Sequence, residues 1–244
     1  MIIIQQMILL SFQNKDFHPS CMLKTIYIVK GLSDEDYKQF EKRMFTLAER
    51  ITSLVKPDTL KLNLTLEAPP ILSVIPFSRL MVAAFSVTGK TSEPIHAISE
   101  TGGYNGTYQV EEAVPVSYVK EWEDGTPTPG TCMLTLFRRK PGLDDETFLR
   151  RWHDGHTPLS LRLHPLWNYN RNVVTCASGD SRVPHEGIVE EQFLTKAELL
   201  NPFRFFGPPL KTPLHMLQVL KDSRSFIDMK TIEIYLTTEF HLKS

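Results

Sequence analysis

Hydrophobic and polar positions alternate along this chain with two different periods, which separate expected strands from expected helices. In the first half, segments 23–29, 60–66, 80–87 and 108–119 are apolar or alternate apolar with polar residues, as is typical of strands. A short helix is expected over 93–100. After the first strand, Ser33 with Asp36 three residues later predicts a helix N-cap. The apolar residues that follow recur every three or four positions and predict one buried helical stripe: Tyr37, Phe40, Met44, Leu47, Ile51 and Leu54.

The second half repeats this order of elements. Strands are expected over 132–138, 167–176, 188–195 and 232–238. A helix is expected from Asp144 to about His156, where Pro158 should end it. The capping box of Thr195 and Glu198 predicts the start of a second helical region, which resumes at Thr212. Both halves therefore have the order βαββαβ.

The two halves also match in sequence at a fixed offset. Gly31-Leu-Ser-Asp-Glu-Asp-Tyr37 aligns with Gly142-Leu-Asp-Asp-Glu-Thr-Phe148, an offset of 142 − 31 = 111 residues that also aligns segment 22–23 with 133–134. The segment 122–130 between them is rich in turn residues. We therefore expect a tail over 1–21, a first, divergent repeat over 22–125 and a second repeat over 126–244.

A βαββαβ unit is the ferredoxin-like arrangement, in which both helices cover one face of an antiparallel sheet. In segment 133–137 both faces of the strand are largely apolar, so the second face also needs a cover. The twin sheet can supply that cover. The expected fold is α+β: two ferredoxin-like repeats packed sheet to sheet as an intrachain dimeric α-β barrel.

Composition narrows the class of protein. The chain has 244 residues, a formal net charge of −1 and no dense Lys/Arg cluster, so nucleic acid and membrane surfaces are not expected partners. Three cysteines without Cys-x-x-Cys spacing indicate a reduced, cytoplasmic chain. Residues 1–10 are apolar but lack a basic start and a signal cleavage site, so an added tail is favoured over a secretory signal.

Three segments resemble a known family. They are Leu134-Thr-Leu-Phe-Arg-Arg-Lys-Pro-Gly-Leu-Asp-Asp-Glu-Thr-Phe148, Trp152-His-x-x-His-x-Pro-Leu159 and Tyr169-Asn-x-Asn172. They are similar to the EthD family of the dimeric α-β barrel superfamily, and the closing segment 221–241 is similar as well. The resemblance implies a cofactor-free enzyme, an oxidoreductase or monooxygenase, isomerase or lyase, with its site between the sheet and the first helix.

His156 is the first candidate for catalysis. It continues the stripe of Phe148 and Trp152 toward the sheet, whereas His153 is turned away. The resemblance assigns only His156 to the family's His-x-Pro-Leu motif. An imidazole exchanges protons near neutrality and can act as a general base. The alternative is a structural histidine that hydrogen-bonds the last carbonyls of its helix.

The strand that begins near Trp167 supplies the other candidates. If its odd positions face the site, Tyr169 can donate to a developing oxyanion and Trp167 can stack on a flat substrate. If its even positions do, Asn170 is the polar partner, and Trp152 is a substrate-binding candidate in both cases. His153, Asp154 and His156 lack a suitably spaced third ligand, so no metal site is expected.

Two functional hypotheses follow. The first is a cofactor-independent EthD-type enzyme that uses His156 for proton transfer on a small aromatic or polyketide-like substrate. The second is a non-catalytic barrel that binds a small hydrophobic molecule or serves as an assembly module. No phosphate-binding loop, nucleotide fingerprint or Ser/His/Asp spacing is present in the sequence. The chain is expected to be a monomer with an intrachain pseudo-dimer, or a homodimer.

Overall fold

The computed structural model describes residues 23–89, 95–179 and 184–244, so the expected tail and Cys21 lie outside the described residues. Among the described residues, none of the helices has both the length and the apolar character needed to cross a bilayer. Eight strands form the sheet: β1 (Leu23–Lys30), β2 (Thr59–Leu64), β3 (Val82–Gly89), β4 (Tyr104–Val116), β5 (Thr131–Phe137), β6 (Asn168–Ser178), β7 (Gly187–Phe193) and β8 (Glu233–Lys243).

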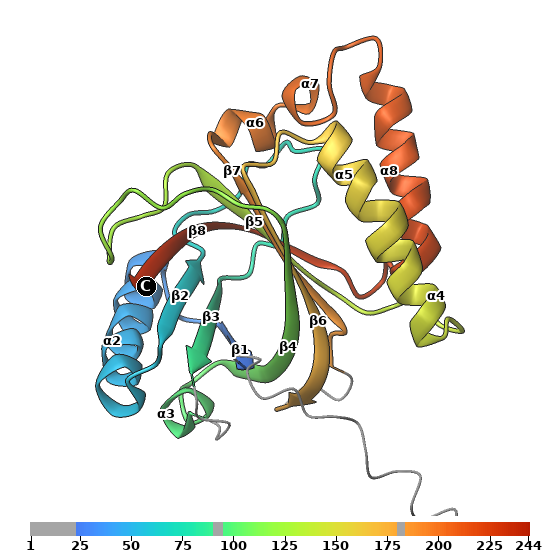
Figure 1. The fold of residues 1–244 in the computed structure, drawn as a ribbon. Coiled ribbons are helices and arrows are strands. Elements are labelled where there is room, and N and C mark those ends of the chain that lie inside the picture. The colour runs from blue at the N-terminus through green and yellow to red at the C-terminus, as the bar shows by residue number, and fades with distance from the viewer. Residues whose placement is uncertain (1–22, 90–94, 180–183) are drawn as a thin grey trace, which may run out of the picture.

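The strands form one closed antiparallel barrel (Figure 1). Its order is β1-β3-β2-β8-β5-β7-β6-β4, so the first four strands are ordered β4-β1-β3-β2 and the last four β8-β5-β7-β6. The pairs β2–β8 and β4–β6 join the two halves by backbone hydrogen bonds. The second face of each half-sheet therefore lies inside one barrel that both halves share, and the side chains of the other half cover it there.

Helices cover the barrel in two separate groups (Figure 1). The first group is α2 (Tyr37–Val55) and α3 (His96–Ser99). The second is α4 (Asp145–Arg150), η1 (Arg151–His156), α5 (Thr157–Leu163), α6 (Lys196–Leu200), α7 (Pro202–Phe205) and α8 (Thr212–Phe226). In Figure 1 the continuous helix α4–η1–α5 runs alongside α8.

Most of the expected elements are confirmed, with differences at their ends. The predicted stripe of α2 is buried at Phe40, Met44, Leu47 and Ile51, whereas Tyr37 is only partly buried and Leu54 is exposed. The predicted cap Ser33 is wrong, because Asp36 caps the helix and forms a capping box with Gln39. The second predicted capping box, at Thr195, is confirmed.

The barrel interior has an apolar end and a polar end. Strand alternation sends one set of side chains inward, and at one end these are apolar: Ile26, Ile28, Val82, Ala84, Leu134, Leu136, Ile188 and Tyr235. At the other end Lys61 and Asn63 also point inward, so the expected half-buried strand at 60–66 is covered on both faces. The outer faces of β5, β6 and β7 pack on the second helical group.

Candidate functional site

A cavity of about 450 Å³ lies between the outer face of the second half of the barrel and its helices. Volumes of this order are typical of sites for small molecules. Its wall is mainly apolar and includes the aromatic side chains Phe137, Trp152, Phe205, Phe206 and Phe226. Its polar side chains are Thr135, His156, Ser160, His164, Tyr169, Glu191 and Ser223.

The helical wall contains a π-helical turn, η1, which positions His156. The backbone N–H of Thr157 bonds to the carbonyl of Trp152, five residues back, and the Thr157 hydroxyl donates to the same carbonyl at 3.0 Å. Pro158 falls in the first turn of α5, where its missing N–H is tolerated. The prediction that Pro158 ends the helix is therefore wrong. The helix runs on to Leu163, so no helix C-terminus faces His156.

Trp152 is fully buried, as its place on the apolar stripe predicted. Its ring meets Phe137 edge-on with 5.0 Å between centroids and stacks on Phe226. His153, on the neighbouring position of the same turn, does not line the cavity, and burial lowers the pKa of its imidazole. The expected difference in facing between His153 and His156 is thus present.

His156 forms a hydrogen-bonded chain with Asp222 of α8 and Ser160 of α5. Its Nδ1 lies 2.7 Å from Oδ2 of Asp222, and its Nε2 lies 3.2 Å from Oγ of Ser160. Because a carboxylate only accepts hydrogen bonds, the neutral ring carries its hydrogen on Nδ1, and the lone pair of Nε2 accepts from the hydroxyl of Ser160. Asp222 fixes this tautomer and leaves Nε2 as the basic atom.

Tyr169 and Glu191 form a cross-strand pair on the sheet wall of the cavity. They are directly opposite each other in the β6–β7 register, and both are more than nine-tenths buried. Burial raises the pKa of Tyr169 to about 12 and the pKa of Glu191 to about 8. Both side chains therefore carry their proton at neutral pH and can donate hydrogen bonds.

His164 is a third titratable group on the cavity wall. Its Nδ1 donates to the carbonyl of Phe205 at 3.0 Å, and its ring stacks on that of Phe205. Burial lowers the pKa of His164 to about 4, so the ring is neutral at pH 7. Among residues 23–89, 95–179 and 184–244, no group of three or more His, Cys, Asp or Glu side chains is arranged to hold a metal ion.

Two of the predicted binding residues lie away from this cavity. Trp167 precedes β6 and packs on Tyr118 and Trp122, with centroids 4.8 and 5.8 Å away. Strand alternation does not extend to it, so Trp167 and Tyr169 do not share a site. Asn170 faces the barrel interior, where its Nδ2 donates to Glu112 at 2.6 Å. The odd face of β6 is the outer, cavity-lining face, because the even positions complete the polar end of the barrel.

The polar end of the barrel interior is an ion-pair network that the sequence did not reveal. Lys24 lies 2.6 Å from Glu112 and 2.9 Å from Glu190, and Lys61 lies 3.2 Å from Glu239. Burial alone would raise the pKa of Glu190, but Lys24 and Lys61 outweigh it and lower that pKa to about 2. The network pairs two lysines with three carboxylates and joins five strands.

Ser160, Glu191 and Asp222 were missed as site residues by sequence reasoning. Asp222 lies 66 residues from its partner His156, and no local spacing joins them. Glu191 carried a weak signal, since a pair of acidic residues interrupts the apolar strand 188–193. Asp222 lies inside the closing segment that resembles the EthD family, but nothing there distinguishes it from Asp228.

Comparisons with known proteins support the fold. No family model matches the chain, and no curated protein matches it. A solved structure of an anthrone oxidase-like protein superposes with a TM-score of 0.55 at 12% identity, over 91% of this chain and 92% of its own. A protein provisionally named a monooxygenase, from Fusobacterium nucleatum subsp. nucleatum, gives a TM-score of 0.49 at 9% identity, over 92% and 94%. The first of these likenesses identifies the α+β barrel as the dimeric α-β barrel type of fold.

Proposed function

We propose that this protein is a cofactor-independent, oxidase- or monooxygenase-like enzyme that acts on a small aromatic or polyketide-like substrate. His156 is the general base that takes a proton from the bound substrate. The observation that carries the proposal is the His156–Asp222 pair, with 2.7 Å between its nitrogen and oxygen, at the wall of a mainly apolar cavity. An apolar site with a few fixed polar groups is typical of enzymes that bind flat, poorly soluble substrates.

In the proposed reaction, Nε2 of His156 removes a proton from a carbon that is conjugated with a carbonyl. The C–H electron pair moves into the conjugated system and the negative charge reaches the carbonyl oxygen. Asp222 stabilises the imidazolium that forms. The substrate class follows that of the anthrone oxidase-like neighbour. For a methylene group, dioxygen is the oxidant: one oxygen atom enters the new carbonyl, and the other leaves as water with the two hydrogens.

Tyr169 and Trp152 keep the roles expected for them in this proposal. Tyr169 donates toward the anion, and the buried ring of Trp152 forms part of the surface against which the substrate packs. The resemblance to the EthD family belongs to the same proposal. So does the division into two ferredoxin-like repeats over 22–125 and 126–244, which the matching strand orders β4-β1-β3-β2 and β8-β5-β7-β6 support.

A second candidate is suggested by the chain Ser160–His156–Asp222. Serine, imidazole and carboxylate in this order are the arrangement of acyl-transfer hydrolases, with Ser160 as nucleophile. Ser160 sits within a helix, however, where neighbouring backbone N–H groups are already bonded and cannot form an oxyanion hole. Proton transfer is therefore the better-supported function.

The experiment is hydrogen–deuterium exchange of the methylene group of anthrone in D₂O without oxygen, followed by NMR. The protein should accelerate exchange, and His156→Gln should lower the rate by roughly 10²- to 10⁴-fold, because glutamine cannot take up the proton. With air admitted, oxygen uptake and anthraquinone formation should fall in parallel. The matched control is His153→Gln on the same turn, which should leave both rates unchanged.

Three results would count against this function. Exchange that survives His156→Gln would show that His156 is not the base. Anthrone binding without any exchange would favour the non-catalytic barrel. Ser160→Ala distinguishes the second candidate: a hydrolase loses its turnover of nitrophenyl esters and its labelling by a fluorophosphonate, whereas the proton-transfer enzyme keeps its exchange rate within a few-fold.

A further inference from the structure

We infer that Glu191 is a neutral carboxylic acid that donates a hydrogen bond to a carbonyl oxygen of the substrate. The substrate class is then a conjugated ketone whose acidic C–H lies across the molecule from its carbonyl. This inference rests on the proposed function and names the second polar group of the same site. Glu191 would contact the oxygen on which the negative charge develops.

Glu191 is a buried carboxyl group on the cavity wall without a partner of its own. Glu191 is 7% exposed, and its side chain makes no hydrogen bond or ion pair with any of the described residues. Its neighbours in the sheet register are Met133 of β5 and Tyr169 of β6, neither of which is a cation. A polar group this deeply buried is costly unless a ligand satisfies it.

The surroundings keep Glu191 protonated near neutrality. Burial raises the pKa of this carboxyl to about 8, and no cation opposes the shift. The acidic proton is therefore present below about pH 8 and is lost above it. The titratable side chains that share the cavity are Tyr169 from β6, His156 from η1 and His164 directly after α5, while β5, β8 and α8 add none to its lining.

The helical wall and the sheet wall of the cavity supply polar groups with opposite chemical roles. His156 belongs to the helical wall and has the basic Nε2 atom, whereas Glu191 belongs to the sheet wall and has an O–H donor. When His156 takes the proton, charge moves through the conjugated system to the carbonyl oxygen. A hydrogen bond from Glu191 becomes stronger at that moment, because its acceptor turns from a carbonyl into an oxyanion.

The test compares the binding of anthrone with that of 9,10-dihydroanthracene, which has the same three rings but no carbonyl. Dissociation constants are measured without oxygen between pH 6 and 9.5. At pH 6.5 the wild-type protein should prefer anthrone by about tenfold, the worth of one buried hydrogen bond. The preference should disappear above pH 8, when the carboxylate can no longer donate.

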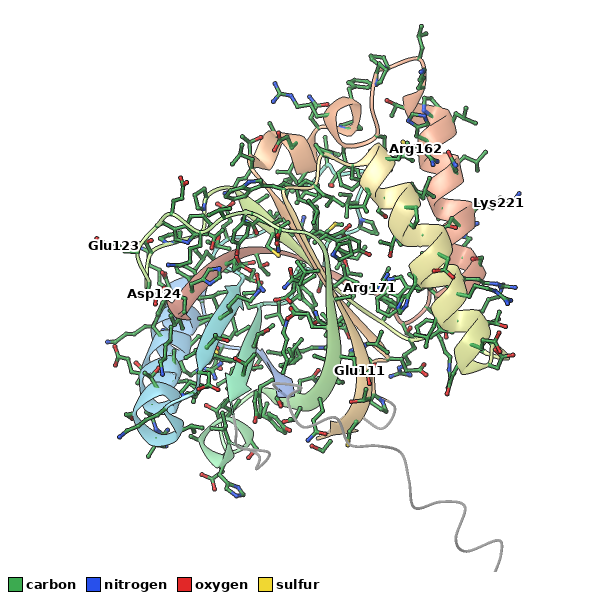
Figure 2. The ribbon with its side chains drawn as sticks, viewed as in Figure 1. Glu111, Glu123, Asp124, Arg162, Arg171 and Lys221 are labelled. Atoms are coloured by element: carbon green, nitrogen blue, oxygen red, sulfur yellow. The ribbon has the colours of Figure 1, made fainter. Side chains whose placement is uncertain are left out.

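Two variants separate the causes. Glu191→Gln keeps an N–H donor and does not titrate, so it should retain the preference at every pH. Glu191→Leu has no donor and should lose the preference at every pH, while still binding dihydroanthracene as a sign that the cavity is intact. The control is Glu111→Gln, an exposed carboxyl group on β4 labelled in Figure 2, which should behave as wild type.

Different measurements test the role of Glu191 and the catalytic role of His156, so either can fail without the other. If Glu191→Leu prefers anthrone as strongly as the wild type does, or if the wild-type preference persists at pH 9.5, the role of Glu191 is wrong even when His156-dependent exchange proceeds. If exchange is absent but the preference follows Glu191 as described, the substrate class stands and the catalytic proposal fails.

Discussion

Replacing Glu191 by glutamine should remove most of the loss of stability that this protein suffers as the pH rises. In the native state the carboxyl keeps its proton up to about pH 8, whereas in the unfolded chain it releases the proton near the ordinary value of 4.5. Between these two values the native state binds more protons than the unfolded state. The free energy of unfolding therefore falls as the pH rises through this window.

The magnitude follows from the width of the window. A difference of about 3.5 pH units, at 1.36 kcal/mol for each unit, corresponds to about 5 kcal/mol at pH values above 8. The group is 7% exposed, so solvent screens this cost very little. Below pH 4.5 both states are protonated, and the glutamine variant should then match the wild type in stability.

The assay is urea unfolding of both proteins, followed by tryptophan fluorescence, at intervals from pH 4.5 to 9. His164 acts in the opposite direction, because its depressed pKa of about 4 makes the native state lose stability as the pH falls below 6.5. That contribution is common to both proteins and cancels in their difference. Parallel curves for wild type and Glu191→Gln would show that Glu191 is ionised or solvated, and would refute the reasoning.

Three further predictions concern packing and stability. Trp152→Ala should cost about 3–5 kcal/mol in urea unfolding, because the ring is fully buried, and a loss below about 1 kcal/mol would contradict this packing. Lys24→Met should destabilise the barrel by about 3–5 kcal/mol at pH 7, since it leaves Glu190 charged and underpaired, and calorimetry that finds a rise in Tm would refute this. Asp36→Ala should lower the free energy of unfolding by about 1 kcal/mol and Ser33→Ala by much less, as measured by the same unfolding assay. Equal losses would contradict the assignment of Asp36 as the cap.

The elements of the fold were predictable because their signals are local. Period-two and period-three-to-four patterns record which face of a strand or helix is buried, and each pattern is complete within one segment. The stripe of α2 and the capping box at Thr195 were found in this way. The prediction of Ser33 as the cap was wrong because Ser33 and Asp36, three positions apart, can both serve as an N-cap. Only the course of the backbone decides which of them does.

The course of the helix near Pro158 was decided by local geometry that the sequence does not specify. A proline normally ends an α-helix, yet here Pro158 directly follows the π-helical turn and lies in the first turn of α5, where its missing N–H is tolerated, and the helix continues. This changes the environment of His156 from a helix end to the middle of a cavity wall. The sequence indicated which histidine faces the sheet, but not what surrounds it.

The sequence by itself determined the order of elements, the facing of Trp152 and His156 from their helix toward the sheet, and the barrel type of fold. The tertiary structure alone decided that Asp222 fixes the tautomer of His156, that Glu191 stands beside Tyr169, and that Trp167 and Asn170 lie elsewhere. The physical reason is distance along the chain. Burial patterns repeat within a few residues, but the barrel closure and helix packing that unite a site join side chains far apart in sequence, and no local period encodes that closure.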